Sequence, residues 1–550
     1  MTATNRALEP TRVGPSPVQE LRTGGELVVG ALAEHGVDTV FGIPGVHTLA
    51  LYDALRGSPV RHVLARHEQG AGFMADGYAR ACGRPGVAVV ISGPGVTNIA
   101  TPVGEAFTDS SPVLVLSSNV ERAHVDRMRG NLHDLKDQRG VMAAVTKWNA
   151  RVDLAADVPA AMAEAFRQLT IGRPQPVHLE FPLDVLDERA VATPPPAPVP
   201  TAAPDARALD RAVERLSGLR RVVLYVGGGA VAAAAGPPLL ALAERLGAPI
   251  ITSIMGKGAV PEDHPLVIGA LWQPGNAVDA LLREADGLVV VGSKLGFQAT
   301  EGFHLPIPST LIRIDIDPDE LVLNATPTFG IVGDAASATA GIVARLAQAG
   351  FATDGFGPTR ATAARESART AAFGHDRLPY LDAVRRAIPR NGILVNDMTM
   401  MSYAACGLYP AYEPRTFFFP AGYGTLGFAL PAAIGAKIAR PRAGVVAVCG
   451  DGGFQFTMSE LGTAVQERIG LPVVIFNDST YSAVKDAQAR ERGGRFLAVD
   501  LVNPDYVDLA CAYRIPGVRV HDSEALYREI VAALARDLPT LIDVRIAPWV

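Results

Sequence analysis

Two stretches in the C-terminal third decide the fold: Gly444-Val445-Val446-Ala447-Val448-Cys449-Gly450-Asp451-Gly452 and Pro472-Val473-Val474-Ile475-Phe476-Asn477-Asp478-Ser479-Thr480. Each begins with a short, β-rich apolar run bounded by Gly or Pro, which is typical of an inner strand of a parallel sheet. Each run ends in a polar turn, and parallel sheets bind ligands at the carboxyl ends of their strands. The two stretches therefore predict a ligand site at one edge of an α/β sheet.

The polar turns carry oxygen atoms suited to a hard divalent cation. Asp451 and Asp478 are 27 positions apart, and carboxylates together with a nearby backbone carbonyl suit Mg²⁺ that shares its remaining positions with phosphate and water. The glycines of the first turn, Gly450, Gly452 and Gly453, let the backbone approach a diphosphate. Each turn alone is common, as a strand-to-helix turn or a loop start, but their coupled spacing is not.

This spacing resembles the thiamine diphosphate motif, in which GDG is followed farther along by NN. The resemblance implies that Asp451, the side chain of Asp478 and the carbonyl of Thr480 bind Mg²⁺, with Tyr481 beside the cofactor. The second Asn of the motif is Asp478 here. An aspartate also ligates Mg²⁺, but it adds a negative charge near the diphosphate.

A second constellation is Ala65-Arg66-His67-Glu68-Gln69-Gly70-Ala71-Gly72-Phe73-Met74-Ala75-Asp76-Gly77-Tyr78-Ala79-Arg80. It resembles the catalytic-glutamate segment of the acetolactate synthase and 2-oxo acid decarboxylase superfamily. Glu68 follows an expected strand at 60–65 and opens a helix of small residues, which predicts that its carboxylate faces a ligand crevice. The alternative is an ordinary helix N-terminal glutamate, favoured by the helix dipole.

Three further segments resemble the same superfamily in order and spacing. Residues 41–49 and 91–98 resemble its two substrate-side loops, and residues 422–433 resemble the segment that holds the aminopyrimidine ring. By that resemblance the Gly424 carbonyl and the Leu426 N–H contact the ring, the Leu426 side chain bends the cofactor, and Thr425 lies between them.

The resemblance also implies a substrate pocket. Its lining would include Val46, Gln138, Ala483, Val484 and Ala487. His47 and His133 lie in segments that approach the substrate in relatives, and imidazole suits a proton donor near neutral pH. A structural role for either histidine is equally consistent with the sequence.

Length and composition fit a multidomain protein. The chain has 550 residues, 48% of them hydrophobic, and a net charge of −6 with scattered Lys and Arg, which disfavours nucleic acid and anionic membranes as partners. Its four cysteines have no metal-ligand spacing, which favours a reducing, cytoplasmic location. The Pro-rich start does not match a signal peptide, and no apolar run is long enough to span a membrane.

Short Val/Ile/Leu runs alternate with Ala-rich helical patterns, which predicts an α/β protein of three doubly wound parallel-sheet domains. We expect the boundaries to be a disordered tail at 1–20, a pyrimidine-binding domain with the catalytic Glu at 21–190, a Pro-rich linker at 191–206, a middle domain at 207–345, a second linker at 346–376 and a diphosphate- and Mg-binding domain at 377–550.

The middle domain contains Gly227-Gly228-Gly229, which does not match the spaced dinucleotide fingerprint and predicts a tight strand-to-helix turn. Some relatives bind FAD or another adenine nucleotide in this domain, so FAD binding stays open. Glu68 and the metal motif fall in different domains, and in the superfamily the cofactor lies between these two domains of different chains. The resemblance therefore implies a homodimer or homotetramer whose active sites lie between subunits.

The sequence thus predicts thiamine diphosphate- and Mg²⁺-dependent, non-oxidative decarboxylation of a 2-oxo acid through a C2 carbanion and an enamine. The alternatives are acetolactate synthase-type carboligation, a flavin-linked 2-oxo acid oxidase and a non-catalytic protein of the same fold. The N-terminal third most closely resembles 5-guanidino-2-oxopentanoate (2-ketoarginine) decarboxylases, whereas residues 481–488 do not. A guanidinium substrate would pair with a carboxylate such as Asp134 or Asp137, either of which is equally suited to be a solvated loop charge.

Overall fold

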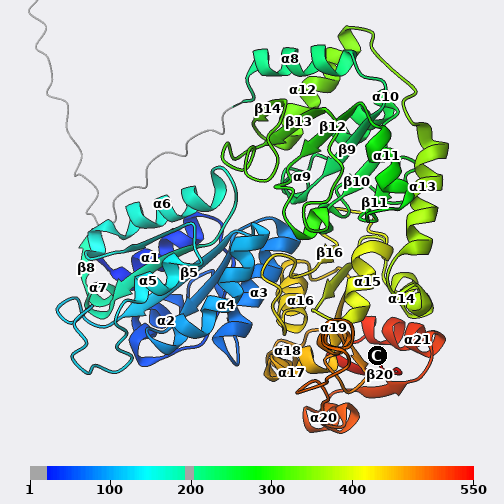
Figure 1. Ribbon diagram of the computed structural model, residues 1–550. Helices are drawn as coiled ribbons and strands as arrows, with labels where there is room; N and C mark the ends of the chain where they lie inside the picture. Colours follow the sequence, from blue (N-terminus) through cyan, green and yellow to red (C-terminus); the bar gives the residue numbers. More distant parts are fainter. Residues whose placement is uncertain (1–20, 192–202, 550) are drawn as a thin grey trace, which may run out of the picture.

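The computed structural model describes residues 21–191 and 203–549, and these form three α/β domains in chain order (Figure 1). Each domain holds a six-stranded sheet whose neighbouring strands are all parallel. The predicted tail, 1–20, and most of the Pro-rich linker, 192–202, lie outside the described residues. The predicted α/β class with three parallel-sheet domains is confirmed.

The N-terminal domain is built on a sheet of order β3-β2-β4-β5-β7-β6. In that order the strands are Arg61–Leu64, Thr39–Gly42, Gly86–Val90, Val113–Asn119, Val177–Pro182 and Trp148–Arg151. The helices α1 to α7 are Gly24–Glu34, Leu49–Leu55, Glu68–Cys82, Pro94–Asp109, Gln138–Ala143, Val158–Thr170 and Leu183–Asp187. A small antiparallel ribbon pairs β1 (Leu21–Thr23) with β8 (Arg189–Val191), which brings the two ends of the domain together.

The middle domain has the sheet order β11-β10-β9-β12-β13-β14. These strands are Val267–Gly269, Ile250–Thr252, Val222–Val226, Gly287–Val291, Thr310–Asp315 and Phe329–Val332. The helices α8 to α13 are Ala206–Ser217, Gly228–Ala232, Gly236–Leu246, Ala277–Glu284, Ala335–Gln348 and Gly357–Ala371. Gly227 lies between β9 and the short α9 and is the N-cap residue of that helix, in the predicted strand-to-helix turn. Helix α13 falls within the expected linker 346–376 and packs against α11 and β11.

The C-terminal domain has the sheet order β16-β15-β17-β18-β20-β19. These strands are Phe417–Phe418, Ile393–Asn396, Val445–Gly450, Pro472–Asn477, Thr540–Arg545 and Gly517–Val520. The helices α14 to α21 are Leu378–Ala387, Met400–Leu408, Ala429–Ala439, Asp451–Gln455, Leu461–Gln466, Ser482–Arg492, Tyr506–Ala512 and Ser523–Leu534. Every residue of β17 and β18 is buried, which confirms that the two apolar runs are inner strands.

The C-terminal sheet shares one core with each of the other domains. Along β17, Val445 and Ala447 belong to a hydrophobic cluster that continues into α3 and β4 of the N-terminal domain. Val446 and Val448 point to the other face, into a cluster that includes α13 and β9 of the middle domain. Both faces are therefore covered, which explains why these strands are continuously apolar.

Helices α3 and α16 make the closest contact between the N- and C-terminal domains and lie side by side in Figure 1. A Cβ atom on Gly77 would lie 2.0 Å from the carbonyl oxygen of Ala432, and one on Gly435 would lie 1.9 Å from that of Met74. The two backbones approach this closely only because each helix presents glycine to the other. The small residues that surround Glu68 in the sequence are therefore a helix-packing surface.

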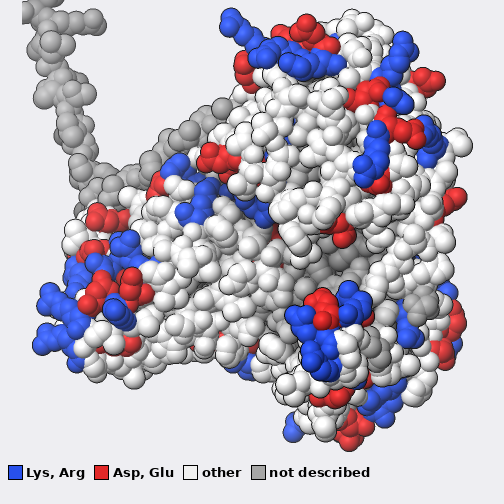
Figure 2. All heavy atoms as spheres, in the orientation of Figure 1, with Lys and Arg blue, Asp and Glu red and all other residues white. Residues whose placement is uncertain are grey.

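Charged side chains gather on the outer ends of the three domains, whereas the face over α3, α4 and α16 is largely free of them in this view (Figure 2). Among the described residues, the structure contains no helix with both the length and the apolar character needed to cross a bilayer.

We predict that Gly77→Ala lowers the free energy of unfolding by about 1–3 kcal/mol, the usual cost of overpacking, because the new methyl group meets backbone that cannot move aside. Chemical denaturation measures the effect. The matched control is Gly30→Ala in α1, where the nearest heavy atom would be 3.7 Å from the new Cβ, and we expect no loss of stability there. Equal stability of Gly77→Ala and the wild type would contradict the close packing.

Candidate active site

Glu68 is the first residue of α3 and lies at the carboxyl edge of the N-terminal sheet, just after β3. Its side chain is half-buried, and Asn98 in α4 donates a hydrogen bond from Nδ2 to Oε2 at 2.9 Å. No hydrogen bond from the described part of the chain reaches Oε1. The carboxylate is thus held through one oxygen and offers the other to a ligand.

His47 and His133 meet at the same edge. Their rings form an edge-to-face pair with centroids 5.1 Å apart. His47 is buried, and its Nδ1 lies 2.7 Å from the Ser92 hydroxyl. Burial, with a smaller contribution from His133, lowers the pKa of His47, so the imidazole is neutral near pH 7. The structure therefore brings together the two histidines that the sequence singled out.

Gln138 lies beneath the loop that carries Ser92 and Gly93. Its Oε1 accepts a hydrogen bond from the Gly93 N–H at 2.9 Å, and its Nε2 donates to the Ser118 carbonyl and to Glu180, each at 2.9 Å. The side chain is 1% exposed. The Gln138 amide therefore holds the loop within its own domain. Val46, which was predicted to line the same pocket, is well exposed.

Asp451 begins α17 at the carboxyl end of β17 and is buried. Asn503 donates to its Oδ2 at 2.6 Å, and the Asn503 amide also donates to Oδ1 of Asn477. Burial and the nearby charge of Asp478 raise the pKa of Asp451 to about 6. Asn503 thus fixes the orientation of the predicted metal ligand.

Asp478 follows β18 and accepts a hydrogen bond from the Ser482 hydroxyl. Burial raises the pKa of Asp478 as well. Two neighbouring carboxylates, one buried and one half-buried, with raised pKa values form a donor set that a hard divalent cation would stabilise. No group of three His, Cys, Asp or Glu side chains with metal-site geometry occurs among the described residues, and a site of two carboxylates and a backbone carbonyl would not require one. The residues present therefore fit Mg²⁺.

The rest of the predicted diphosphate segment is tightly packed. A Cβ on Gly452 would lie 2.4 Å from the Tyr481 ring, and one on Gly453 would lie 3.2 Å from Oδ1 of Asp397. Gly450 similarly faces Thr399. The Thr480 hydroxyl donates to the Val499 carbonyl at 2.8 Å. These glycines keep the turn compact against its own domain.

Helix α19 begins directly after this segment and carries the other predicted pocket residues. Only Ser482 of the helix is buried, Ala483 and Ala487 are partly exposed, and Val484 is 52% exposed. An apolar helix face that one chain leaves open is suited to border a pocket completed by another component.

Two buried carboxylates hold the segment around Leu426. Asp397, after β15, accepts hydrogen bonds from the N–H groups of Gly427 and Ala429. Glu105, from α4 of the N-terminal domain, accepts from the Thr425 N–H at 3.2 Å and hydroxyl at 2.9 Å. Leu426 is therefore fixed on both sides. Gly424, just before it, has a φ of +73°.

Comparison with known proteins agrees with this architecture. Residues 22–141 match the family model of the thiamine pyrophosphate enzyme N-terminal TPP binding domain, residues 209–342 the central domain, and residues 397–544 the C-terminal TPP binding domain. The chain is also 40% identical to the "Probable 2-ketoarginine decarboxylase AruI" of Pseudomonas aeruginosa, over 97% of this chain and 96% of that protein. The chain belongs to the thiamine pyrophosphate enzymes.

Other relatives of this thiamine pyrophosphate enzyme carry a different name. It is 32% identical to a "Probable acetolactate synthase large subunit" of Methanocaldococcus jannaschii, over 96% of this chain and 92% of the relative. It is 34% identical to the acetolactate synthase large subunit of Corynebacterium glutamicum, over 96% and 88%. The resemblance to this superfamily inferred from the motifs is thus confirmed.

Asp134 and Asp137, the two carboxylates considered as partners of a guanidinium substrate, already accept hydrogen bonds from nearby backbone. Asp134 is half-buried, and its Oδ2 accepts from the N–H groups of Gly130 and Asn131. Asp137 is exposed, and its Oδ1 caps α5 through the Gly140 N–H at 2.7 Å. Each keeps one carboxylate oxygen for another partner.

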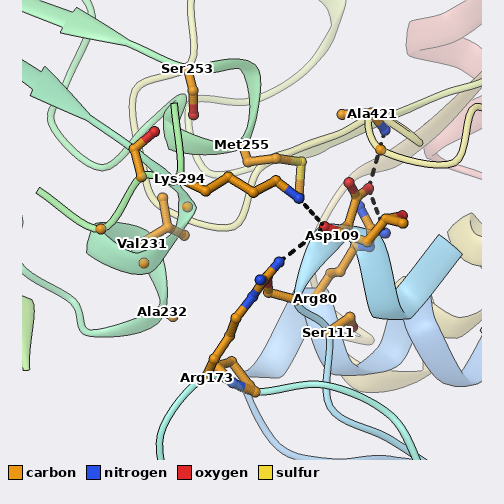
Figure 3. A pocket seen from close by; sticks show the side chains of 18 of the residues that line it. Arg80, Asp109, Ser111, Arg173, Val231, Ala232, Ser253, Met255, Lys294 and Ala421 are labelled. Carbon is orange, nitrogen blue, oxygen red and sulfur yellow. Dashed lines mark hydrogen bonds and ion pairs between the residues drawn. The ribbon is translucent and has the colours of Figure 1, made fainter. Parts of the chain in front are cut away.

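A cavity of about 580 Å³ lies where the N-terminal, middle and C-terminal domains meet (Figure 3). Lys294 of the middle domain crosses it to donate to the Thr108 carbonyl at 3.1 Å. Arg173 also points into it and forms an ion pair with Glu320. Arg80 stands at its base, paired with Asp76 and Asp109. Lys257 and Arg415 also line it, so five cations from the three domains border the cavity.

The sequence analysis missed Glu105, Asp397 and Asn503 as parts of the site. The sequence pattern could have identified Asp397, because it directly follows the apolar run of β15, as Asp451 follows that of β17. No local pattern could have identified Glu105 or Asn503, because their partners are distant in the sequence.

We predict that Glu105 makes stability fall as pH rises. Burial, then the charge of Asp109, raises the pKa of Glu105 from 4.5 to about 8. Between these values the folded enzyme keeps a proton that the unfolded chain has lost, so the free energy of unfolding decreases with pH. Glu105→Gln should remove this decrease in denaturation curves measured across that range. The control is Glu164→Gln, because the Arg167 hydrogen bond lowers the pKa of that half-buried carboxyl. An unchanged pH dependence in Glu105→Gln would contradict the shift.

Proposed function

We propose that this enzyme catalyses the thiamine diphosphate- and Mg²⁺-dependent, non-oxidative decarboxylation of a 2-oxo acid, with 5-guanidino-2-oxopentanoate as the first candidate. The observation that carries the proposal is the pair of carboxylates, buried Asp451 and half-buried Asp478, just after the ends of two adjacent strands of one domain. A non-catalytic protein of the same fold would have no need to keep this pair. When bound, thiamine diphosphate supplies the electron sink that lets a 2-oxo acid lose CO₂.

The residues of the chain bind and orient the cofactor. Asp451, Asp478 and the Thr480 carbonyl would hold Mg²⁺, which would neutralise the diphosphate. Leu426, fixed by Glu105 and Asp397, would pack against the cofactor. The Oε1 of Glu68 would hydrogen-bond the aminopyrimidine ring, while Asn98 keeps the carboxylate from rotating.

We assign different roles toward the substrate to His47 and His133. His47 is neutral and buried and bonded to Ser92 through Nδ1, which leaves Nε2 to hydrogen-bond the substrate. His133 is less buried, so we assign to it the donation of the proton that releases an aldehyde. Asp134, next to His133, is the carboxylate placed to pair with a guanidinium group.

Carboligation of the acetolactate synthase type is the second candidate, and the acetolactate synthase relatives favour it. The cavity between the three domains bears on this choice, because its five cations suit the phosphates of an adenine nucleotide such as FAD. A flavin absorption spectrum in the purified enzyme would support the carboligase or the flavin-linked oxidase. Its absence after purification would favour the decarboxylase.

A homodimer, alone or within a tetramer, would complete the active site. The N-terminal half of the site is bordered by the exposed apolar residues Val46, Leu49 and Leu132. The C-terminal half is bordered by exposed Tyr423, Phe456, Val484 and Val502. Two copies related by a two-fold axis, each placing its N-terminal half against the C-terminal half of the other, would cover both sets. We place the enzyme in the cytoplasm, where its free cysteines stay reduced.

We predict that Glu68→Gln keeps cofactor affinity close to that of the wild type and slows exchange of the C2 proton of bound thiamine diphosphate by at least about 100-fold, the scale of a lost general acid–base group. Calorimetry measures the affinity, and NMR after acid quench measures the exchange. Equal exchange rates in the two proteins would contradict the role of Glu68.

Product analysis decides between the candidate reactions. The enzyme, thiamine diphosphate and Mg²⁺ are incubated with pyruvate or with 5-guanidino-2-oxopentanoate, and the products are identified by NMR and mass spectrometry. We expect an aldehyde from the guanidino acid, and Asp134→Asn should raise KM for that substrate alone. Asp137→Asn, whose carboxylate caps a helix, is the matched control and should leave KM unchanged. Acetolactate from pyruvate as the main product would overturn the decarboxylase assignment.

A further inference from the structure

Glu460 of the C-terminal domain contacts the backbone that precedes Glu68. It is the last residue of the 3₁₀ turn Met458–Glu460 and is fully buried. Its Oε1 accepts hydrogen bonds from the N–H groups of Arg66 and His67, each at 3.0 Å, and its Oε2 lies 3.1 Å from the Arg66 N–H. The contact joins residues nearly 400 positions apart in the sequence.

These bonds help to fix the start of α3. The first backbone N–H groups of a helix have no partner within the helix and need one from elsewhere. The His67 ring accepts from the Gln69 N–H at 3.0 Å, and Glu460 takes the two N–H groups before Glu68. The peptide units on both sides of Glu68 are therefore held by side chains, and one of these comes from another domain.

The residues around the Glu460 carboxylate leave room for it and hydrogen-bond to it. A Cβ on Gly70 would lie 2.2 Å from Oε1 of Glu460, so α3 leaves room for it with a glycine. The Thr463 hydroxyl lies 2.7 Å from Oε2 and 3.0 Å from the Leu64 carbonyl. Burial raises the pKa of Glu460, and the hydrogen bonds from Thr463, Arg66 and His67 oppose that shift. Every oxygen thus has a donor, as a buried carboxylate requires.

We propose that Glu460 is a positioning residue for Glu68, and that it ties the orientation of Glu68 to the metal-binding segment of its own chain. The proposal rests on the role of Glu68 given above. Asp451 begins α17, and the same short stretch of chain ends at Glu460. In the dimer proposed above, Asp451 and Glu68 of one chain serve different active sites, so this link connects the two sites.

The first test is amide hydrogen exchange of a peptide spanning residues 64–68 in the cofactor-free protein. We expect protection in the wild type and in Glu460→Gln, because a glutamine oxygen still accepts from Arg66 and His67 while its NH₂ donates to Thr463. Glu460→Ala should lose this protection. Gly70→Ala should lose it as well, because its methyl group displaces an intact carboxylate.

The second test is C2 proton exchange of bound thiamine diphosphate. Glu460→Ala and Gly70→Ala should be slower by about 10- to 100-fold, the scale of a displaced catalytic group, and Glu460→Gln should recover most of the rate. The matched control is Glu467→Gln, which removes an ion pair with Arg61 at the same domain boundary without touching residues 66–68. It should behave as the wild type in both tests.

The outcomes separate the hypotheses. Wild-type amide protection and exchange rate in Glu460→Ala would overturn the proposal, and Gly70→Ala decides the matter if Glu460→Ala does not fold. A slow rate in Glu460→Gln with its amides still protected would also overturn it, because Glu460 would then act through its charge. If the wild type itself shows no C2 exchange, the proposed function fails, while amide exchange still reports whether Glu460 holds the segment.

Discussion

The structure depends on the close approach of α3 and α16. Gly77 and Gly435 let the two backbones touch, and the apolar residues around them join the N- and C-terminal domains into one core. Glu68 stands at the start of one of these helices, and the segment with Leu426 leads into the other. The contact therefore sets the position of both segments that we propose to bind the cofactor, and a shift between the helices would move them together.

Apolar packing brings the domains together, but buried carboxylates fix the orientation of the segments. Glu105 reaches from the N-terminal domain to Thr425, and Glu460 reaches back from the C-terminal domain to Arg66 and His67. Each domain thus contributes a glutamate that binds the backbone of the other. Burying a carboxyl group is costly unless its oxygens are hydrogen-bonded, so these contacts require a more exact geometry than apolar contacts do.

The sequence was sufficient to predict the features that depend on a local pattern of residues. The apolar runs of β17 and β18 placed Asp451 and Asp478 at strand ends, and the small residues after Glu68 indicated a helix. The sequence was insufficient to predict the interactions that depend on tertiary contact. Glu105 and Glu460 lie in helical turns where a glutamate is ordinary, and their partners are more than 300 residues away. The segment 346–376, expected to be a linker, contains α13, and the packing of this helix against α11 and β11 also depends on tertiary contact.

The central claim is that Glu68 of one chain and Asp451 of another form one cofactor site. The most direct measurement mixes Glu68→Gln chains with Asp451→Ala chains, lets the dimers exchange subunits, and follows C2 proton exchange of thiamine diphosphate. Neither variant alone should support exchange. A one-to-one mixture should recover about a quarter of the wild-type sites, because half of the dimers are mixed and one of their two sites is intact. No recovery, with mixed dimers shown to be present, would contradict the claim.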